Sequence, residues 1–236
     1  MDANEALARL KTLSDRTALE GMARYGINTK KAYGVSVSNL RELAKEIGQD
    51  HVLAQELWAS GIHEARILAS IVDDPRQVSD RQLERWVSAL DSWDLCDQCV
   101  GNLFDKTRFA YKKAVEWSGR GDEFVKRAGF AMMARLAVHD KRADDSRFLR
   151  FLSIIEREAG DDRLLVRKAV NWALRQIGKR NPTLNRRAIK TALSIKKQDS
   201  SSARWIASDA IRELTGSGIR VRLRRTRGSP PTIRRL

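Results

Sequence analysis

The chain has 236 residues and carries 45 Lys and Arg against 30 Asp and Glu, a formal net charge of +15. This excess favours a polyanionic partner, either nucleic acid or an anionic membrane surface, over a merely basic protein without one. No run of about 18 apolar residues is present to span a membrane. The charged stretch MDANEALARLKTL at the N-terminus lacks the apolar core of a signal peptide. A cytoplasmic, nucleoid-associated protein without membrane contact is expected.

Helical periodicity, with apolar residues three and four apart, dominates the chain. The segments that show it are residues 39–48, 51–60, 63–72, 79–90, 122–138, 145–159 and 164–179. Ser79 and Asp161 stand where helix N-caps are expected, and Gly48, Gly61 and Gly216 where helices are expected to end. The pattern predicts an all-α protein with short loops.

Two internal offsets narrow the architecture. RAGFAMMARLA (127–137) aligns with RKAVNWALRQI (167–177) at an offset of 40, and NWALRQI (171–177) aligns with SDAIREL (208–214) at an offset of 37. Periods of this length built from helix pairs are typical of HEAT-like solenoids, whose stacked pairs curve into a concave surface. The sequence therefore predicts a single HEAT-like α-helical repeat domain over residues 1–217, with a concave basic face.

The C-terminal segment, residues 218–236, has a different composition. Its stretch IRVRLRRTRGSPPTIRRL contains seven arginines, two prolines and no acidic residue. Low hydrophobicity and high charge predict a disordered tail. Two roles stay open for it: sequence-independent contacts with phosphates, or a dispensable solvated segment.

The stretch DSWDLCDQC (91–99) contains Cys96 and Cys99 at the spacing of a redox pair or half a zinc site. A structural zinc site needs four ligands, and the three histidines, His51, His63 and His139, lack a matching spacing. A redox pair normally opens a helix after a strand, and no strand pattern is present. On a helical wheel both thiols join one apolar arc, formed by Leu95, Cys96, Cys99, Val100 and Leu103. The cysteines are therefore predicted to pack in the core, and no metal or cofactor is expected.

Trp93 and Asp97 lie on the other side of the same predicted helix, one turn apart, and Gly101 continues their stripe. An aromatic ring beside a carboxylate on a non-core face indicates a candidate site. The alternative is a tryptophan that packs on a neighbouring helix at the rim of the core, next to an ordinary solvated aspartate.

Trp172 is a second aromatic residue on a polar face. It lies roughly opposite the core arc of its helix and is flanked by Lys168, Arg175 and Lys179. Such a ring can stack on a sugar or base while the neighbouring cations hold phosphates. The alternative is an interhelical wedge between repeats, and the contact with a ligand is favoured here.

Arg127 lines up with the small residues Ala131 and Ala134 and with Val138 on a narrow stripe. An arginine beside small residues suits the close approach of phosphate or carboxylate. An Arg127 paired with an acidic residue inside the repeat stack is equally compatible with the pattern.

Four stretches together resemble the AlkD-type DNA alkylation-repair glycosylases, a family built from HEAT-like repeats. They are YGINTKKAYGVSVSNLRELAKE (25–46), SWDLCD (92–97), FVKRAGF (124–130) and VRKAVNWALRQIGKRNP (166–182). The resemblance covers roughly residues 15–215. It departs from the family at Ser92, where the family often has a second tryptophan before the acid.

The resemblance implies a role for each matching residue. Asp97 corresponds to the catalytic carboxylate, Trp93 and Trp172 to cleft tryptophans, and Arg127 to a cleft arginine. The side chains expected to hold DNA phosphates are Lys168, Arg175, Lys179, Arg135 and Arg212.

The implied function is that of a metal-free, monofunctional DNA glycosylase of base excision repair, acting as a monomer on double-stranded DNA. It would hydrolyse the N-glycosidic bond of cationic N3- or N7-alkylated purines. Such a purine is already a good leaving group, so a carboxylate that stabilises an oxocarbenium-like sugar and orients water is suited to the reaction. The alternative is a non-catalytic HEAT-like module that binds duplex or branched DNA. The charge disfavours a third possibility, a protein-binding solenoid.

Overall fold

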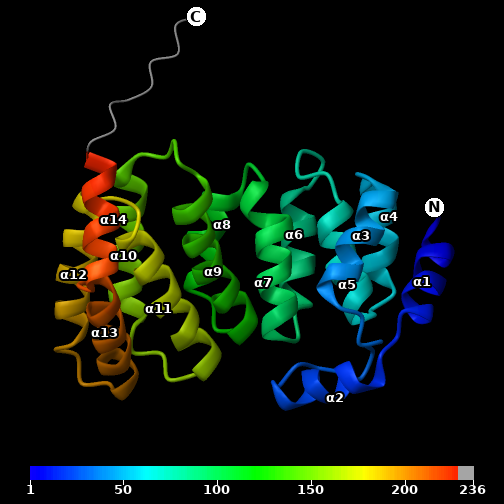
Figure 1. The fold of residues 1–236 in the computed structure, drawn as a ribbon, viewed down its shortest axis with the longest axis horizontal. Coiled ribbons are helices and arrows are strands. Elements are labelled where there is room, and N and C mark those ends of the chain that lie inside the picture. The colour runs from blue at the N-terminus through cyan, green and yellow to red at the C-terminus, as the bar shows by residue number, and fades with distance from the viewer. Residues whose placement is uncertain (228–236) are drawn as a thin grey trace, which may run out of the picture. The chain divides into compact units, whose positions relative to one another are not determined.

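The computed structural model describes residues 1–227, which form fourteen α-helices, one 3₁₀ helix and no strand (Figure 1). This confirms the predicted all-α class. The chain divides into two compact units, Met1–Lys113 and a second that starts at Ala114, and each unit is described by itself. The single domain expected over residues 1–217 stays a prediction. Within the described residues, the helices are too short or too polar to cross a membrane.

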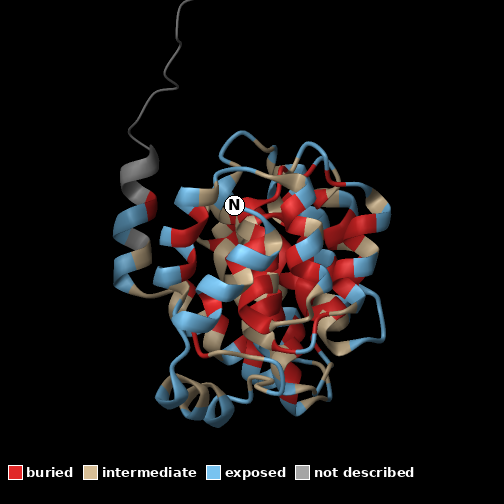
Figure 2. Cartoon of the chain, turned by 90° about the vertical axis from the view of Figure 1, so that its right-hand side faces the viewer, coloured by how far each residue is buried: buried red, intermediate tan, exposed pale blue. Residues whose placement is uncertain are grey.

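The first unit is a stack of short helices. They are α1 (Ala3–Thr12), α2 (Arg16–Arg24), α3 (Val37–Ile47), α4 (His51–Ala59), α5 (His63–Val72), α6 (Asp80–Ser88), α7 (Trp93–Asn102), η1 (Phe104–Lys106) and α8 (Ala110–Ser118), which contains the boundary between the units. Helix α5 is central because it contacts α3, α4 and α7. In Figure 2 the buried positions lie where helices face one another, whereas α2 has no buried residue.

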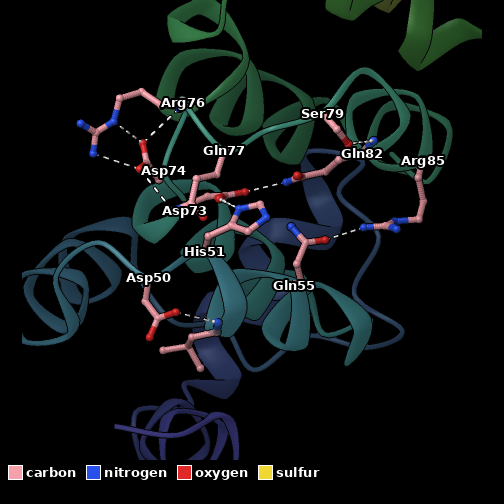
Figure 3. Close-up of polar contacts among 11 residues, drawn as sticks. Asp50, His51, Gln55, Asp73, Asp74, Arg76, Gln77, Ser79, Gln82 and Arg85 are labelled. Carbon is pink, nitrogen blue, oxygen red and sulfur yellow. Dashed lines mark hydrogen bonds and ion pairs between the residues drawn. The ribbon is translucent and has the colours of Figure 1, made fainter.

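A buried polar network fixes the loop between α5 and α6 to the start of α4 (Figure 3). His51 Nδ1 lies 2.6 Å from Asp73 Oδ1, and the amide of Gln82 donates to Asp73 Oδ2 at 2.6 Å. Burial raises the pKa of Asp73, although hydrogen bonds from His51 and Gln82 partly oppose this effect. Since Asp73 is only 3% exposed, its partners are needed to offset the cost of burying the carboxyl group.

The second unit repeats a pattern of long helices. They are α9 (Glu123–His139), α10 (Asp145–Glu158), α11 (Leu164–Gly178), α12 (Pro182–Ile195), α13 (Ser201–Leu214) and α14 (Ser217–Arg227). Helix α11 contacts α9 on one side and α13 on the other (Figure 1), and α12 contacts α10, α11 and α13. The aligned segments 127–137, 167–177 and 208–214 thus fall on α9, α11 and α13, three successive members of one row.

Most of the predicted helix boundaries are confirmed. The Ser79 hydroxyl accepts from the amide of Gln82, and Gly48 ends α3 with a positive φ of 75°. Helix α4 ends at Ala59, shortly before Gly61, and α13 ends at Leu214, shortly before Gly216.

Asp161 is not an N-cap, which corrects the sequence-based prediction. Helix α11 begins at Leu164 with Arg163 at the N-cap position. The Asp161 carboxylate instead pairs with the guanidinium of Arg163 at 2.6 Å and with Lys126 Nζ at 2.9 Å. Burial raises the pKa of Asp161, but the hydrogen bonds from Arg163 and Lys126 lower it to about 2. Asp161 also accepts from the backbone amide of Arg163 at 3.2 Å, so it links the residues before α11 to Lys126 of α9.

The predicted disordered tail is also corrected in part. Residues 217–227 form helix α14, which contacts α13. Leu223 is 7% exposed, so an apolar residue anchors this arginine-rich helix. The rest of the predicted tail, residues 228–236, lies outside the described residues.

The structure confirms that Cys96 and Cys99 pack in the core. Both are fully buried on α7 and do not form a disulfide. Burial raises the pKa of the Cys99 thiol strongly, against a smaller opposite effect of the Ser70 hydroxyl. Among the described residues, no group of three or more His, Cys, Asp or Glu side chains is placed to hold a metal ion.

We expect neither thiol of the native protein to react with Ellman's reagent, because the thiolate is the nucleophile and both sulfur atoms are shielded from solvent. In guanidinium chloride both thiols should react, which is the internal control. Rapid reaction of either thiol under native conditions would show that this part of α7 is not core.

Candidate functional site

Helix α7 separates its residues into two faces, as predicted. Leu95, Cys96 and Cys99 are fully buried, whereas Trp93 and Asp97 remain partly exposed. The indole nitrogen of Trp93 donates to the carbonyl oxygen of Tyr25 at 3.0 Å. This bond holds the Trp93 ring at the C-terminal end of α2. On α7 itself, Trp93 precedes Asp97 by one helical turn.

The start of α7 is held by a partly buried ion pair with the start of α5. His63 Nε2 lies 2.8 Å from Asp94 Oδ2, and His63 is 5% exposed. Burial lowers the pKa of His63, but the hydrogen bond and charge of Asp94 outweigh it, so the pKa is raised; Glu64 and Asp91 add to this effect. Burial raises the pKa of Asp94, but the hydrogen bond and charge of His63 outweigh this effect, so the pKa of Asp94 is lowered. Asp94 therefore has a structural role, because it joins the start of α7 to the start of α5.

The loop between α2 and α3 is bound to the start of α5. Glu64, 1% exposed, accepts hydrogen bonds from the amides of Tyr33, Gly34 and Val35 at 2.9, 2.7 and 3.3 Å. Gly34 has φ +78°, and a β-carbon there would lie 2.2 Å from the carbonyl oxygen of Asp15. Only glycine fits this position, so the loop has a defined path past α5.

In the second unit, Arg127 of α9 points into the row of helices. It is 6% exposed, and its Nη1 donates to the carbonyl oxygen of Leu165 on α11 at 2.8 Å. The predicted contact of Arg127 with an anionic ligand stays a prediction.

Trp172 lies partly exposed on α11, next to buried Asn171 and Ala173. With the Gln176 amide oriented to satisfy both of its neighbours, its oxygen accepts from the Trp172 indole at 3.2 Å and from Lys179 Nζ at 3.3 Å. The ring thus has a fixed polar edge, and its contact with a ligand stays a prediction.

The predicted phosphate-binding side chains differ in their surroundings. Arg175 and Lys179 both pair with Glu213 of α13, Lys179 at 2.7 Å, and Arg212 pairs with Asp209. Burial raises the pKa of Glu213, but hydrogen bonds from Lys179 and Arg175 outweigh it and lower the pKa. Lys168 is exposed and makes no ion pair with any described residue, whereas Arg135 is partly buried.

Sequence reasoning missed a ladder of contacts that joins α11 to α13. The Arg167 guanidinium lies over the Trp205 ring at 4.8 Å, the Asn171 amide donates to Asp209 at 2.7 Å, and Arg175 pairs with Glu213. The partners in each contact are 38 residues apart, as are Arg127 and Leu165. Trp205 is 39% exposed. The signal available in the sequence was Trp205, an aromatic residue that lies one repeat of 38 residues after Arg167.

We expect the ion pair between His63 and Asp94 to give stability a particular pH dependence. Protonated His63 contributes stability that is fully present below its unfolded pKa of 6.5 and is lost as pH rises through its raised folded pKa. Ionised Asp94 contributes stability that is present above 3.8 and is lost as pH falls through its lowered folded pKa. The pair therefore contributes most between pH 3.8 and 6.5.

Asp94→Asn tests this pH dependence. The substitution should lower the free energy of unfolding by about 2 kcal/mol near pH 5.5 and by clearly less near pH 9. Urea titrations of both proteins at the two pH values give the comparison. An equal loss at both would contradict the charged pair.

Comparisons with known proteins agree with this architecture. The family model for the DNA alkylation repair enzyme matches residues 6–214. One solved structure is described as a new family of proteins related to the HEAT-like repeat DNA glycosylases with affinity for branched DNA structures. It shares 21% sequence identity with this chain, with a TM-score of 0.75, over 90% of this chain and 95% of the other. A comparison with curated proteins finds no match. The fold is that of a HEAT-like repeat protein, and the chain belongs to the DNA alkylation repair enzyme family.

Proposed function

We propose that the protein is a DNA glycosylase that hydrolyses the N-glycosidic bond of cationic N3- or N7-alkylated purines in duplex DNA. The observation that supports this most directly is the pair of Trp93 and Asp97, one turn apart on the non-core face of α7, in a member of a DNA alkylation repair family. In this proposal the reaction uses no metal or other cofactor.

Asp97 is the proposed catalytic carboxylate. Loss of the cationic purine leaves positive charge on the deoxyribose, and a nearby carboxylate stabilises that charge and orients the attacking water. Asp94, the other acidic residue of the helix, is held by His63. Trp93 offers an aromatic surface for the sugar and keeps bulk water away from the reacting bond.

Trp172 and Arg127 of the second unit are proposed to contact DNA as the family resemblance implies. Trp172 would pack against a sugar, and Arg127 would place a charge close to the strand. Lys168, Arg175, Lys179, Arg135 and Arg212 are the proposed phosphate contacts. Because Glu213 and Asp209 already pair with three of them, binding to DNA requires exchange of carboxylate partners for phosphates.

A second candidate function is the binding of branched DNA without base excision. It is favoured by the description of the similar solved structure as having affinity for branched DNA structures. Equilibrium binding to a linear duplex and to a four-way junction, measured beside base release, separates the two functions. Tight junction binding without base release would favour this second candidate.

Asp97→Asn should reduce base release at least about 100-fold, because the substitution removes the charge that stabilises the sugar cation. Affinity for the same duplex should change little. The matched control is Asp162→Asn, the same substitution at an exposed position before α11. Single-turnover release of 7-methylguanine from methylated duplex DNA gives the rates. Undiminished release by Asp97→Asn would remove this residue from the mechanism.

Glu213→Gln should strengthen binding to duplex DNA about fivefold, because it removes a carboxylate that competes with phosphate for Arg175 and Lys179. The control is Glu20→Gln on α2, an exposed position where the change in net charge is the same. Fluorescence anisotropy with a labelled duplex measures both affinities. Equal affinities for the two variants would mean that Arg175 and Lys179 do not contact DNA.

A further inference from the structure

The first unit contains a pocket of about 230 Å³ that the sequence did not reveal. We call it the Lys31 pocket. Its lining residues are Asn28, Lys30, Lys31, Gly61, His63, Arg66 and Asp91. They come from the loop after α2, the start of α5 and the residues before α7.

Two cationic groups converge in this pocket. Gly61 has φ +70°, and the place that a β-carbon would take there lies 3.8 Å from Lys31 Nζ and 3.7 Å from Arg66 Nη2. Both cations thus approach the same point. Like charges so close together repel each other, and an anion between them relieves the repulsion.

Arg66 is held in place before any ligand binds. Its guanidinium lies over the Trp58 ring at 5.4 Å, and Trp58 is stacked on Trp86 at 4.0 Å with an interplanar angle of 3°. Nη1 donates to the carbonyl oxygen of Ala89 at 3.3 Å, and Nη2 makes no hydrogen bond with the described residues. A planar guanidinium that is fixed in this way suits an oxyanion.

The loop after α2 that carries Lys30 and Lys31, here called the lysine loop, is also held in place. The amide of His63 donates to the carbonyl oxygen of Lys31 at 2.8 Å, and Glu64 binds the backbone of residues 33–35. The positive end of α5, which has no side-chain cap, lies at the same place and favours negative charge.

Positive charge exceeds negative charge in the Lys31 pocket. Its carboxylate, Asp91, accepts from the Asn28 amide at 2.8 Å and lies 4.0 Å from Arg66. Lys30 and Lys31 are exposed and make no ion pair within the described part of the chain. The pocket is therefore a cavity in which cationic side chains outnumber the carboxylate of Asp91, and it matches a phosphate group.

We propose that the Lys31 pocket binds one phosphate group of a DNA strand that passes Trp93. Asp91 precedes Trp93 by two residues, and the Trp93 indole donates to Tyr25 at the end of α2, just before the lysine loop. A phosphate in the pocket would fix the strand beside the non-core face of α7 and carry no sequence information. This inference rests on the proposed function only in that DNA is the ligand; it does not require base excision.

The combined variant Lys30→Met and Lys31→Met tests the pocket. It should weaken binding to duplex DNA about tenfold at roughly 100 mM salt and reduce the slope of log K against log salt by about 1. The matched control combines Lys11→Met and Lys45→Met, two exposed lysines of the same unit that lie outside the pocket. Thermal unfolding of both variants verifies that the fold is intact. Equal affinity and slope for variant and control would overturn the proposal.

Asp91→Asn provides a test of opposite sign. Removal of the carboxylate should strengthen DNA binding about fivefold, whereas a purely structural role of Asp91 predicts no gain. A loss of affinity in a folded Asp91→Asn protein would contradict the proposal.

Two further measurements identify the source of the phosphate. A duplex closed by hairpins has only backbone phosphates, so a tenfold loss with this duplex supports an internal phosphate. A loss confined to duplexes with a 5′-phosphorylated end assigns the pocket to a strand end. Titration with inorganic phosphate should shift the amide NMR signals of Lys31, Gly61 and His63 in the wild type; unmoved signals together with unchanged DNA binding refute the pocket.

These results separate the pocket from the proposed function. If the wild type releases no base while the lysine variant still weakens binding, excision fails and the phosphate site stands. If base is released and the lysine variant binds like its control, excision stands and the pocket fails.

Discussion

Carboxylates at the joints between helices, one buried and two partly buried, hold together a chain with 45 basic and only 30 acidic side chains. Glu64 holds the loop before α3, Asp94 joins α7 to α5 through His63, and Glu213 joins α13 to α11. Each carboxylate offsets the cost of its own burial with several donors or a charged partner. Lys30, Lys31 and Lys168 are exposed and make no ion pair with the described residues.

Helix α7 shows how one short sequence divides structural and chemical roles. Its cysteines fill the core, Asp94 fixes the helix start, and Trp93 and Asp97 occupy the remaining face. Asp94 thus joins two helices, and Asp97 lies beside Trp93 on the partly exposed face of the same helix. The proposed chemistry depends on this division, because a carboxylate that stabilises a sugar cation must remain ionised and accessible.

The faces of the helices could be predicted because periodicity is a local property. The apolar arc of α7 and the row formed by α9, α11 and α13 followed from spacing alone. Contacts between distant segments could not be predicted in this way. Asp161 pairs with Lys126 instead of capping α11, and Arg175 pairs with Glu213. The Lys31 pocket brings together three separate segments. The helix of residues 217–227 contacts α13 and buries Leu223, which its arginine-rich composition did not indicate.

We propose that this member of the DNA alkylation repair enzyme family breaks an N-glycosidic bond. Product analysis tests it most directly: duplex DNA that contains 7-methylguanine is incubated with the purified protein, and the released material and the strand are both identified. We expect free 7-methylguanine together with an alkali-sensitive abasic site in the DNA. Binding of the duplex without release of the base, or transfer of the methyl group with the purine left in place, would contradict it.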